Sequence, residues 1–197
     1  DVFCSGTLIL VSTILNPTMY PATVRFPDES VTDVPGEVTR TLQSASLRVR
    51  PGMRIAVAVG SRGIGSIAEV VAAAVKWLTS RGAAPFIVPS MGGHGGATAE
   101  GQAAVLASYG VTEASMGVPV LSSMETVRLD SKGLETELFM DRYAWEADGV
   151  LLINRVKPHT DFHGFPESGL VKMGVIGLGK HDQALAVHGH GIRGLKD

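Results

Sequence analysis

Apolar runs alternate with amphipathic stretches through the middle of the chain. Residues 53–59 form a run of apolar and β-branched residues that ends at Gly60, and residues 66–81 carry apolar side chains at helical spacing. Residues 85–89 form a second short apolar run. A strand, a helix and a strand within about 35 residues are typical of a βαβ crossover, so this pattern predicts two parallel strands joined by a helix.

The pattern continues toward the C-terminus. A helix is predicted over 98–109, where the first residue is a threonine that can cap it, and residues 126–129 and 134–139 predict a hairpin. Residues 141–146 predict a short helix and residues 149–154 a third buried strand, after which loops and histidines prevail. The predicted class is therefore α/β, with a Rossmann-like, parallel or mostly parallel sheet, βαβ units and a histidine-rich loop and helix segment at the C-terminus.

The N-terminal residues stand apart from this pattern. Residues 7–15 are the most apolar stretch of the chain and are followed by Asn16-Pro17. They are too few to cross a bilayer, because a membrane span takes about 20 apolar residues. We therefore assign residues 1–19 to a separate N-terminal segment and residues 20–197 to the predicted domain.

Composition narrows the function classes. The 24 glycines and 10 prolines among 197 residues follow no repeat, which excludes a collagen-like or low-complexity chain. A net charge of −2 gives no general attraction to nucleic acid or to an acidic membrane. The single cysteine, Cys4, excludes an internal disulfide framework and an all-cysteine zinc site, and it points to a reducing, cytoplasmic location.

Three loops follow the three predicted strands, and ligands of open parallel sheets bind beyond the carboxyl ends of the strands. The loops span residues 60–66, 90–97 and 154–161. In the first loop Arg62, Gly63 and Gly65 precede a helix N-terminus, where exposed N–H groups and the helix dipole favour an anion such as phosphate. An ordinary turn between a strand and a helix would have a similar glycine content.

The histidines and one lysine are the strongest candidates for chemistry. His94 lies between two glycine pairs and His159 follows a proline at a strand end, so neither position suits a core residue. Imidazole is suited to proton transfer near neutral pH and to binding nickel, zinc or iron. Lys172 is the only charged residue between Gly169 and Gly179, where desolvation would lower its pKa and favour covalent chemistry.

Three runs, in this order along the chain, resemble the lactate racemase family. They are the glycine-rich run around His94 (residues 89–101), the run that ends in Asn-Arg-Val-Lys-Pro-His-Thr-Asp-Phe (residues 147–162), and the run Gly-Leu-Val-Lys-Met-Gly-Val-Ile-Gly-Leu-Gly-Lys-His (residues 169–181). The resemblance implies an isomerase that racemises or epimerises a 2-hydroxy acid with a nickel-pincer nucleotide, pyridinium-3-thioamide-5-thiocarboxylic acid mononucleotide. Residues 20–197 then correspond to the N-terminal, cofactor-binding catalytic domain of that family.

The resemblance also assigns roles to individual residues. His94 and His159 would act as acid and base on opposite faces of the substrate carbon, and Arg62 would lie near the cofactor phosphate and the substrate. Lys172 would be joined covalently to the cofactor, and His188 would complete the coordination of nickel. The implied partners are a small 2-hydroxy acid, the proteins that synthesise the cofactor, and a C-terminal domain that the sequence does not contain.

Two departures from the family pattern concern specific residues. The segment between His159 and Lys172 is a few residues longer than in the founding racemase, which leaves Lys180 as a second candidate for the attachment. We expect Lys172 to be the attachment site, because Lys180 lies beside His181 at the start of a predicted helix, where a charge is readily solvated. The first loop lacks the Asp-x-Thr-Arg pattern of the founding racemase, which bears on the role of Arg62.

Two other function classes remain open at the level of the sequence. A divalent-metal hydrolase could use His94, His159 and His188 as ligands, but it lacks carboxylates, since Asp161 and Glu167 are the only plausible ones. A nucleotide-binding module without catalysis could use the glycine loops alone. A short-chain dehydrogenase fits poorly, because no Tyr-x-x-x-Lys pair is present.

Overall fold

The computed structural model describes residues 23, 30–61, 64–157 and 169–191. Contacts along the chain divide it into a unit Asp1–Val31 and a unit Thr32–Asp197. Almost all of the first unit, and with it the predicted N-terminal segment 1–19, lies outside the described residues. The elements that follow all belong to the second unit.

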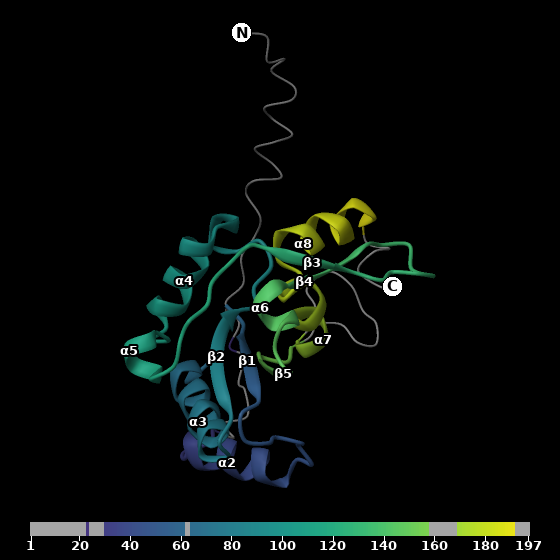
Figure 1. Ribbon diagram of the computed structural model, residues 1–197. Coiled ribbons are helices and arrows are strands. Elements are labelled where there is room, and N and C mark those ends of the chain that lie inside the picture. The colour runs from purple at the N-terminus through teal and green to yellow at the C-terminus, as the bar shows by residue number, and fades with distance from the viewer. Residues whose placement is uncertain (1–22, 24–29, 62–63, 158–168, 192–197) are drawn as a thin grey trace, which may run out of the picture. The chain divides into compact units, whose positions relative to one another are not determined.

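A three-stranded parallel sheet forms the centre of this unit, in the order β2-β1-β5 (Figure 1). The strands are β1 (Arg54–Val59), β2 (Ala84–Pro89) and β5 (Gly149–Ile153). Val57 pairs with Ile87 on one side and with Leu151 on the other. The parallel pairing predicted from the βαβ pattern is confirmed, and the fold is a mixed α/β structure consistent with a Rossmann-like sheet.

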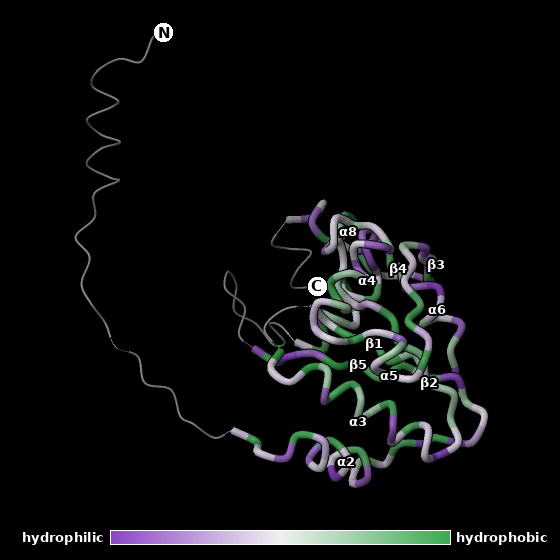
Figure 2. Tube along the Cα trace, turned by 90° about the vertical axis from the view of Figure 1, so that its left-hand side faces the viewer, coloured by the Kyte–Doolittle hydropathy of each residue, from purple (hydrophilic) through white to green (hydrophobic). Residues whose placement is uncertain are grey.

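Both faces of the sheet are covered by buried apolar residues. Val57, Val59 and Ile87 are fully buried on the face that packs against α3 (Ile67–Ser80), the helix that connects β1 to β2. Much of α3 is apolar, as the green parts of its tube in Figure 2 show. The opposite face carries the small Ala56 and Ala58 of β1 together with Phe86 and Val88 of β2.

The remaining helices before β5 surround this sheet. Thr98 caps α4 as predicted, because its side chain accepts a hydrogen bond from the Gly101 backbone N–H. The remaining helices are α2 (Val34–Ser44), α4 (Ala99–Ser108), α5 (Glu113–Met116) and α6 (Arg142–Trp145). Of these, α2 packs against α3.

A hairpin forms a second, smaller sheet. Its strands β3 (Thr126–Leu129) and β4 (Leu138–Asp141) are antiparallel, as predicted. The prediction that the second strand begins at residue 134 is wrong. Leu134 belongs to the turn, since its N–H bonds the Ser131 carbonyl and the preceding Gly133 has a φ of +88°.

After β5, residues 154–157 are irregular, and the next described residues, 169–191, are mostly helical. They form α7 (Leu170–Lys172), a π-helical segment η2 (Met173–Gly177) and α8 (Lys180–Gly189). The predicted histidine-rich segment falls partly on residues 158–168 and 192–197, outside the described residues. β5 was expected to be buried like β1, but as an edge strand it is only partly buried, and Val150 is 38% exposed.

In the part of the chain that is described, no helix has the length and apolar character needed to cross a membrane.

A close approach of two glycines provides a test of this packing. A Cβ on Gly101 would overlap the carbonyl oxygen of Gly95, whereas a Cβ on Gly65 would meet nothing within 4 Å. We expect Gly101→Ala to lower the free energy of unfolding by about 1–2 kcal/mol, because the overlap outweighs the gain of about 1 kcal/mol in helix propensity. Gly65→Ala should stay within about 0.5 kcal/mol of the parent in the same urea titration. Equal stability of the two variants would contradict the packing described.

Candidate functional site

The carboxyl ends of β1 and β2 place a serine against a histidine. Ser61 follows β1 and is 8% exposed, and His94 is exposed in the loop that follows β2. Ser61 Oγ and His94 Nδ1 are 2.7 Å apart, a short hydrogen bond. The two loops therefore meet at this edge of the sheet, as the expected crevice requires.

The loop that carries His94 has a backbone that only small residues adopt readily. Gly92, Gly95 and Gly96 have φ values of +61°, +66° and +68°. Left-handed conformations of this kind cost little for glycine and more for other residues. The glycine pairs on both sides of His94 are thus required by the path of the backbone, which turns the imidazole toward Ser61.

The same loop lies against the segment that follows Lys172. Ser90 Oγ donates a hydrogen bond to the Met173 carbonyl at 3.1 Å, and the Gly92 N–H donates to the Gly177 carbonyl at 3.2 Å. A Cβ on Gly177 would lie 2.6 Å from Ser90 Oγ, so this approach needs a glycine. The structure therefore brings the His94 loop together with η2, which directly follows Lys172 and lies far from the loop in the sequence.

The first glycine loop borders a small cavity of about 190 Å³. Its lining residues are Gly60, Ser61, Ile64, Gly65, Ile67 and Tyr109. The cavity lies at the beginning of α3, where the Ser66 side chain makes no capping hydrogen bond to the helix. Gly65 thus has the expected place beside this helix N-terminus, while Arg62 and Gly63 lie outside the described residues.

Lys172 lies at the end of α7 and is partly buried. Burial lowers the pKa of its ammonium group, and the nearby charge of Lys157 lowers that pKa further. The direction of the shift agrees with the expectation that desolvation acts on Lys172. A lower pKa increases the fraction of neutral amine at a given pH, and the neutral amine is the nucleophile.

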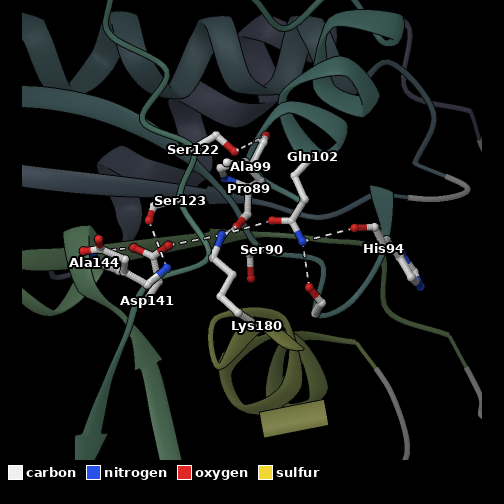
Figure 3. A network of polar contacts seen from close by, with 12 residues as sticks. Pro89, Ser90, His94, Ala99, Gln102, Ser122, Ser123, Asp141, Ala144 and Lys180 are labelled. Atoms are coloured by element: carbon white, nitrogen blue, oxygen red, sulfur yellow. Dashed lines mark hydrogen bonds and ion pairs between the residues drawn. The ribbon is translucent and has the colours of Figure 1, made fainter. Parts of the chain in front are cut away.

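The expectation that Lys180 carries a solvated charge is wrong. Its side chain is fully buried, and its Nζ lies 2.6 Å from the Pro89 carbonyl oxygen, 3.1 Å from Gln102 Oε1 and 3.1 Å from Asp141 Oδ2 (Figure 3). Burial lowers the pKa of Lys180, while the carboxylate of Asp141 raises it. The lysine at the start of α8 is therefore enclosed by three acceptors and is inaccessible to a large cofactor.

The other expected site residues are described only in part. His188 was expected in a loop, but it lies in the last turn of α8, where it is exposed. His159, the second predicted acid or base, falls outside the described residues. Within the described ranges, no group of three or more histidine, cysteine or acidic side chains is close enough to hold a metal ion.

Two residues at this site were not singled out from the sequence. Ser61 belongs to the first glycine loop, but nothing in its neighbours indicates a bond to a histidine 33 residues away. Gln102 is fully buried, and its Nε2 donates hydrogen bonds to the carbonyls of Gly92 and His94. A glutamine among small residues in α4 was the available signal, and it indicates a buried polar partner only once the helix has been placed.

Comparison with known proteins adds no identification: no protein-family model matches the chain, and a search of curated proteins finds no significant match.

The different environments of the two lysines predict different reactivity. Lys172 should react with a limiting amount of an acylating reagent at pH 8 at a higher rate than in a peptide of the same sequence, because its pKa is lowered in the folded protein. Lys180 should stay unmodified until the protein unfolds, since its Nζ is enclosed. Peptide mass mapping measures both rates, and the exposed Lys132 serves as the internal reference. Faster modification of Lys180 than of Lys172 would contradict this assignment.

Proposed function

We propose that this chain is the cofactor-binding catalytic domain of an enzyme that racemises or epimerises a 2-hydroxy acid, as the resemblance to the lactate racemase family implies. The observation that carries the proposal is the hydrogen bond between Ser61 and His94 at the carboxyl edge of the sheet. It holds an exposed imidazole in one orientation in the loop that also contacts the segment after Lys172. A positioned acid–base group thus lies beside the chain segment that would carry the cofactor.

The bond from Ser61 defines the chemistry open to His94. It engages Nδ1, so proton exchange with a substrate hydroxyl falls to Nε2. A serine hydroxyl can donate to Nδ1 or accept from it, so the bond holds the ring in one rotamer and is compatible with either tautomer. Such support of an acid–base histidine by a second polar group is common where proton transfer must be directional.

The residues present fit the proposed nucleotide. Lys172 is a partly buried lysine with a lowered pKa, as amide or thioamide formation from a neutral amine requires. The exposed imidazole of His188 is a suitable ligand for nickel. The cavity beside α3 could take a phosphate group close to the first N–H groups of that helix. When bound, the nucleotide supplies a pyridinium ring that accepts a hydride from C2 of the substrate and returns it.

The remaining parts of the proposal concern partners of the chain and residues that lie outside the described ranges. Racemisation needs a proton acceptor for each enantiomer, and His159 is proposed as the partner of His94 for the second face. Arg62 and Gly63 are proposed to contact the phosphate or the substrate carboxylate. A C-terminal domain, the proteins that make the cofactor and a cytoplasmic location complete the proposal.

The decisive experiment combines mass, metal and isotope measurements. The chain is produced in cells that synthesise the nucleotide, and we expect a covalent adduct on Lys172 together with about one nickel per adduct. A 2-hydroxy acid deuterated at C2 should be racemised with the deuterium retained, because a hydride transferred to an enclosed ring does not exchange with water. Zinc without an adduct, or a nucleotide bound without turnover, would instead support the hydrolase or the binding module.

Substitution of His94 tests the acid–base role against a matched histidine. His94→Ala should reduce the rate of racemisation by about 10²–10⁴-fold, the usual contribution of general acid–base catalysis. His190, at the C-terminal cap of α8, is an exposed histidine without an assigned role, and His190→Ala should remain within about twofold of the parent. Chiral chromatography of the product measures both rates. A loss of only twofold in His94→Ala would exclude the proposed role.

A further inference from the structure

Behind His94, away from its ring, lies a chain of buried polar groups, which we call the Lys180–Gln102 network (Figure 3). It comprises the side chains of Lys180, Gln102 and Asp141 and the carbonyl oxygens of Pro89, Gly92 and His94. All three side chains are fully buried. The mechanism proposed above uses none of these three side chains.

The network holds the backbone of the His94 loop at three points. Lys180 Nζ donates to the Pro89 carbonyl at 2.6 Å, and Gln102 Nε2 donates to the Gly92 carbonyl at 2.6 Å and to the His94 carbonyl at 3.2 Å. Pro89 is the last residue of β2, whereas Gly92 and His94 lie beyond it and outside the strands of the sheet. Side chains from α4 and α8 therefore determine where the backbone of His94 lies.

Lys180 also helps to orient the Gln102 amide. An ammonium group only donates, so the atom of the amide that faces it must be Oε1. The NH₂ group is then directed at the two loop carbonyls, the arrangement in which every polar atom of the amide has a partner. The two loop carbonyls only accept, so they favour the same orientation, and Lys180 reinforces it from the other side.

The backbone of Lys180 adds an independent observation. Its φ is +56°, a left-handed conformation in which glycine is preferred and a long side chain is strained. Its neighbour Gly179 has an ordinary φ of −74°. A lysine held in this conformation at the start of α8 indicates that the placement of its ammonium group outweighs the backbone strain.

From these contacts we propose that Gln102 is a positioning residue for His94 and that Lys180 helps to orient it for this task. The inference rests on the proposed function for its catalytic consequence, but not for its structural content. Because Lys180 begins the helix that ends with His188, the same network ties the His94 loop to the element that bears the proposed nickel ligand. The His94 loop and α8 would therefore keep their relative positions through one set of buried hydrogen bonds.

A second buried glutamine provides the matched control. Gln183 is 1% exposed, its Nε2 donates to the Glu137 carbonyl, and its Oε1 accepts from the Phe139 N–H. It thus has the same burial and the same kind of backbone partners as Gln102, but it contacts the hairpin instead of the His94 loop. Gln102→Met and Gln183→Met remove equivalent groups with little change in volume.

The first measurement is the ¹⁵N spectrum of the imidazole groups, recorded without cofactor. The His94 signals are assigned by their loss in His94→Gln. We expect the parent and Gln183→Met to show a hydrogen-bonded Nδ1 of His94. Gln102→Met should shift the Nδ1 signal toward that of an imidazole in water, because the loop no longer holds the ring against Ser61. Unchanged His94 signals in a folded Gln102→Met protein would overturn the proposal, and so would an equal shift in Gln183→Met.

The second measurement uses the cofactor-loaded chain. Gln102→Met should reduce kcat about 10- to 100-fold with a change in KM of less than threefold, as displacement of a catalytic group does. A kcat equal to that of Gln183→Met would contradict the positioning role. If the parent chain carries no nucleotide adduct on Lys172 after production in cells that synthesise the cofactor, the proposed function fails, and the imidazole spectra still decide whether Gln102 positions His94.

If Gln102→Met does not fold, a second variant keeps the test open. Gln102→Glu retains the size of the side chain and an acceptor for Lys180 but removes the NH₂ donors to the loop. The same shift of the His94 signals is expected. Signals identical to those of the parent would refute the inference.

Discussion

The ammonium group of Lys180 lies where four parts of the chain meet: the end of β2, α4, the start of α6 and the start of α8. Enclosing a charge costs several kcal/mol unless it is compensated. Here the ammonium group donates hydrogen bonds to the Pro89 carbonyl and to Gln102 Oε1, and it forms an ion pair with Asp141 at 3.1 Å. Asp141 supplies the compensating charge and uses its other oxygen to cap α6 through the Ala144 N–H. Removing one member would leave a buried charge or a buried donor unpaired, so these four parts must keep their places together.

Stability alone does not explain such an arrangement. An apolar cluster of similar volume often stabilises a protein as well as a buried ion pair does. A buried ammonium group with polar partners differs from an apolar cluster in that its hydrogen bonds fix the orientation of the groups that make them. In this fold the orientation is transmitted through Gln102 to the carbonyl of His94, and Ser61 holds the ring from the other side. The exposed imidazole thus stands on a rigid support in a loop that contains several glycines.

Small residues of β1 contribute to this support. Ala56 and Ala58 lie in one buried cluster with Phe86, Val88, Ala144 of α6 and Leu178, while the opposite face is filled by valines and isoleucines against α3. The segment after Lys172 can therefore approach the end of β2 closely enough for Ser90 and Gly92 to bond its carbonyls. Larger residues at positions 56 and 58 would separate α8 from the loop and break the contacts of Lys180.

The sequence by itself determined the local elements and their class. The β-branched runs, the cap at Thr98 and the glycines after the helices predict the five strands and the helices α3, α4 and α6, because these signals act over a few residues, whereas α2 and α5 were not predicted. It also indicated His94 and Lys172, since unusual neighbours mark both. Tertiary structure alone decided the environment of Lys180, because three acceptors from positions 89, 102 and 141 enclose it. The contacts of Ser61 and Gln102 with His94 were likewise decided by the tertiary structure. A hydrogen bond between residues far apart in the sequence depends on where the backbone places them, and the local sequence does not determine this.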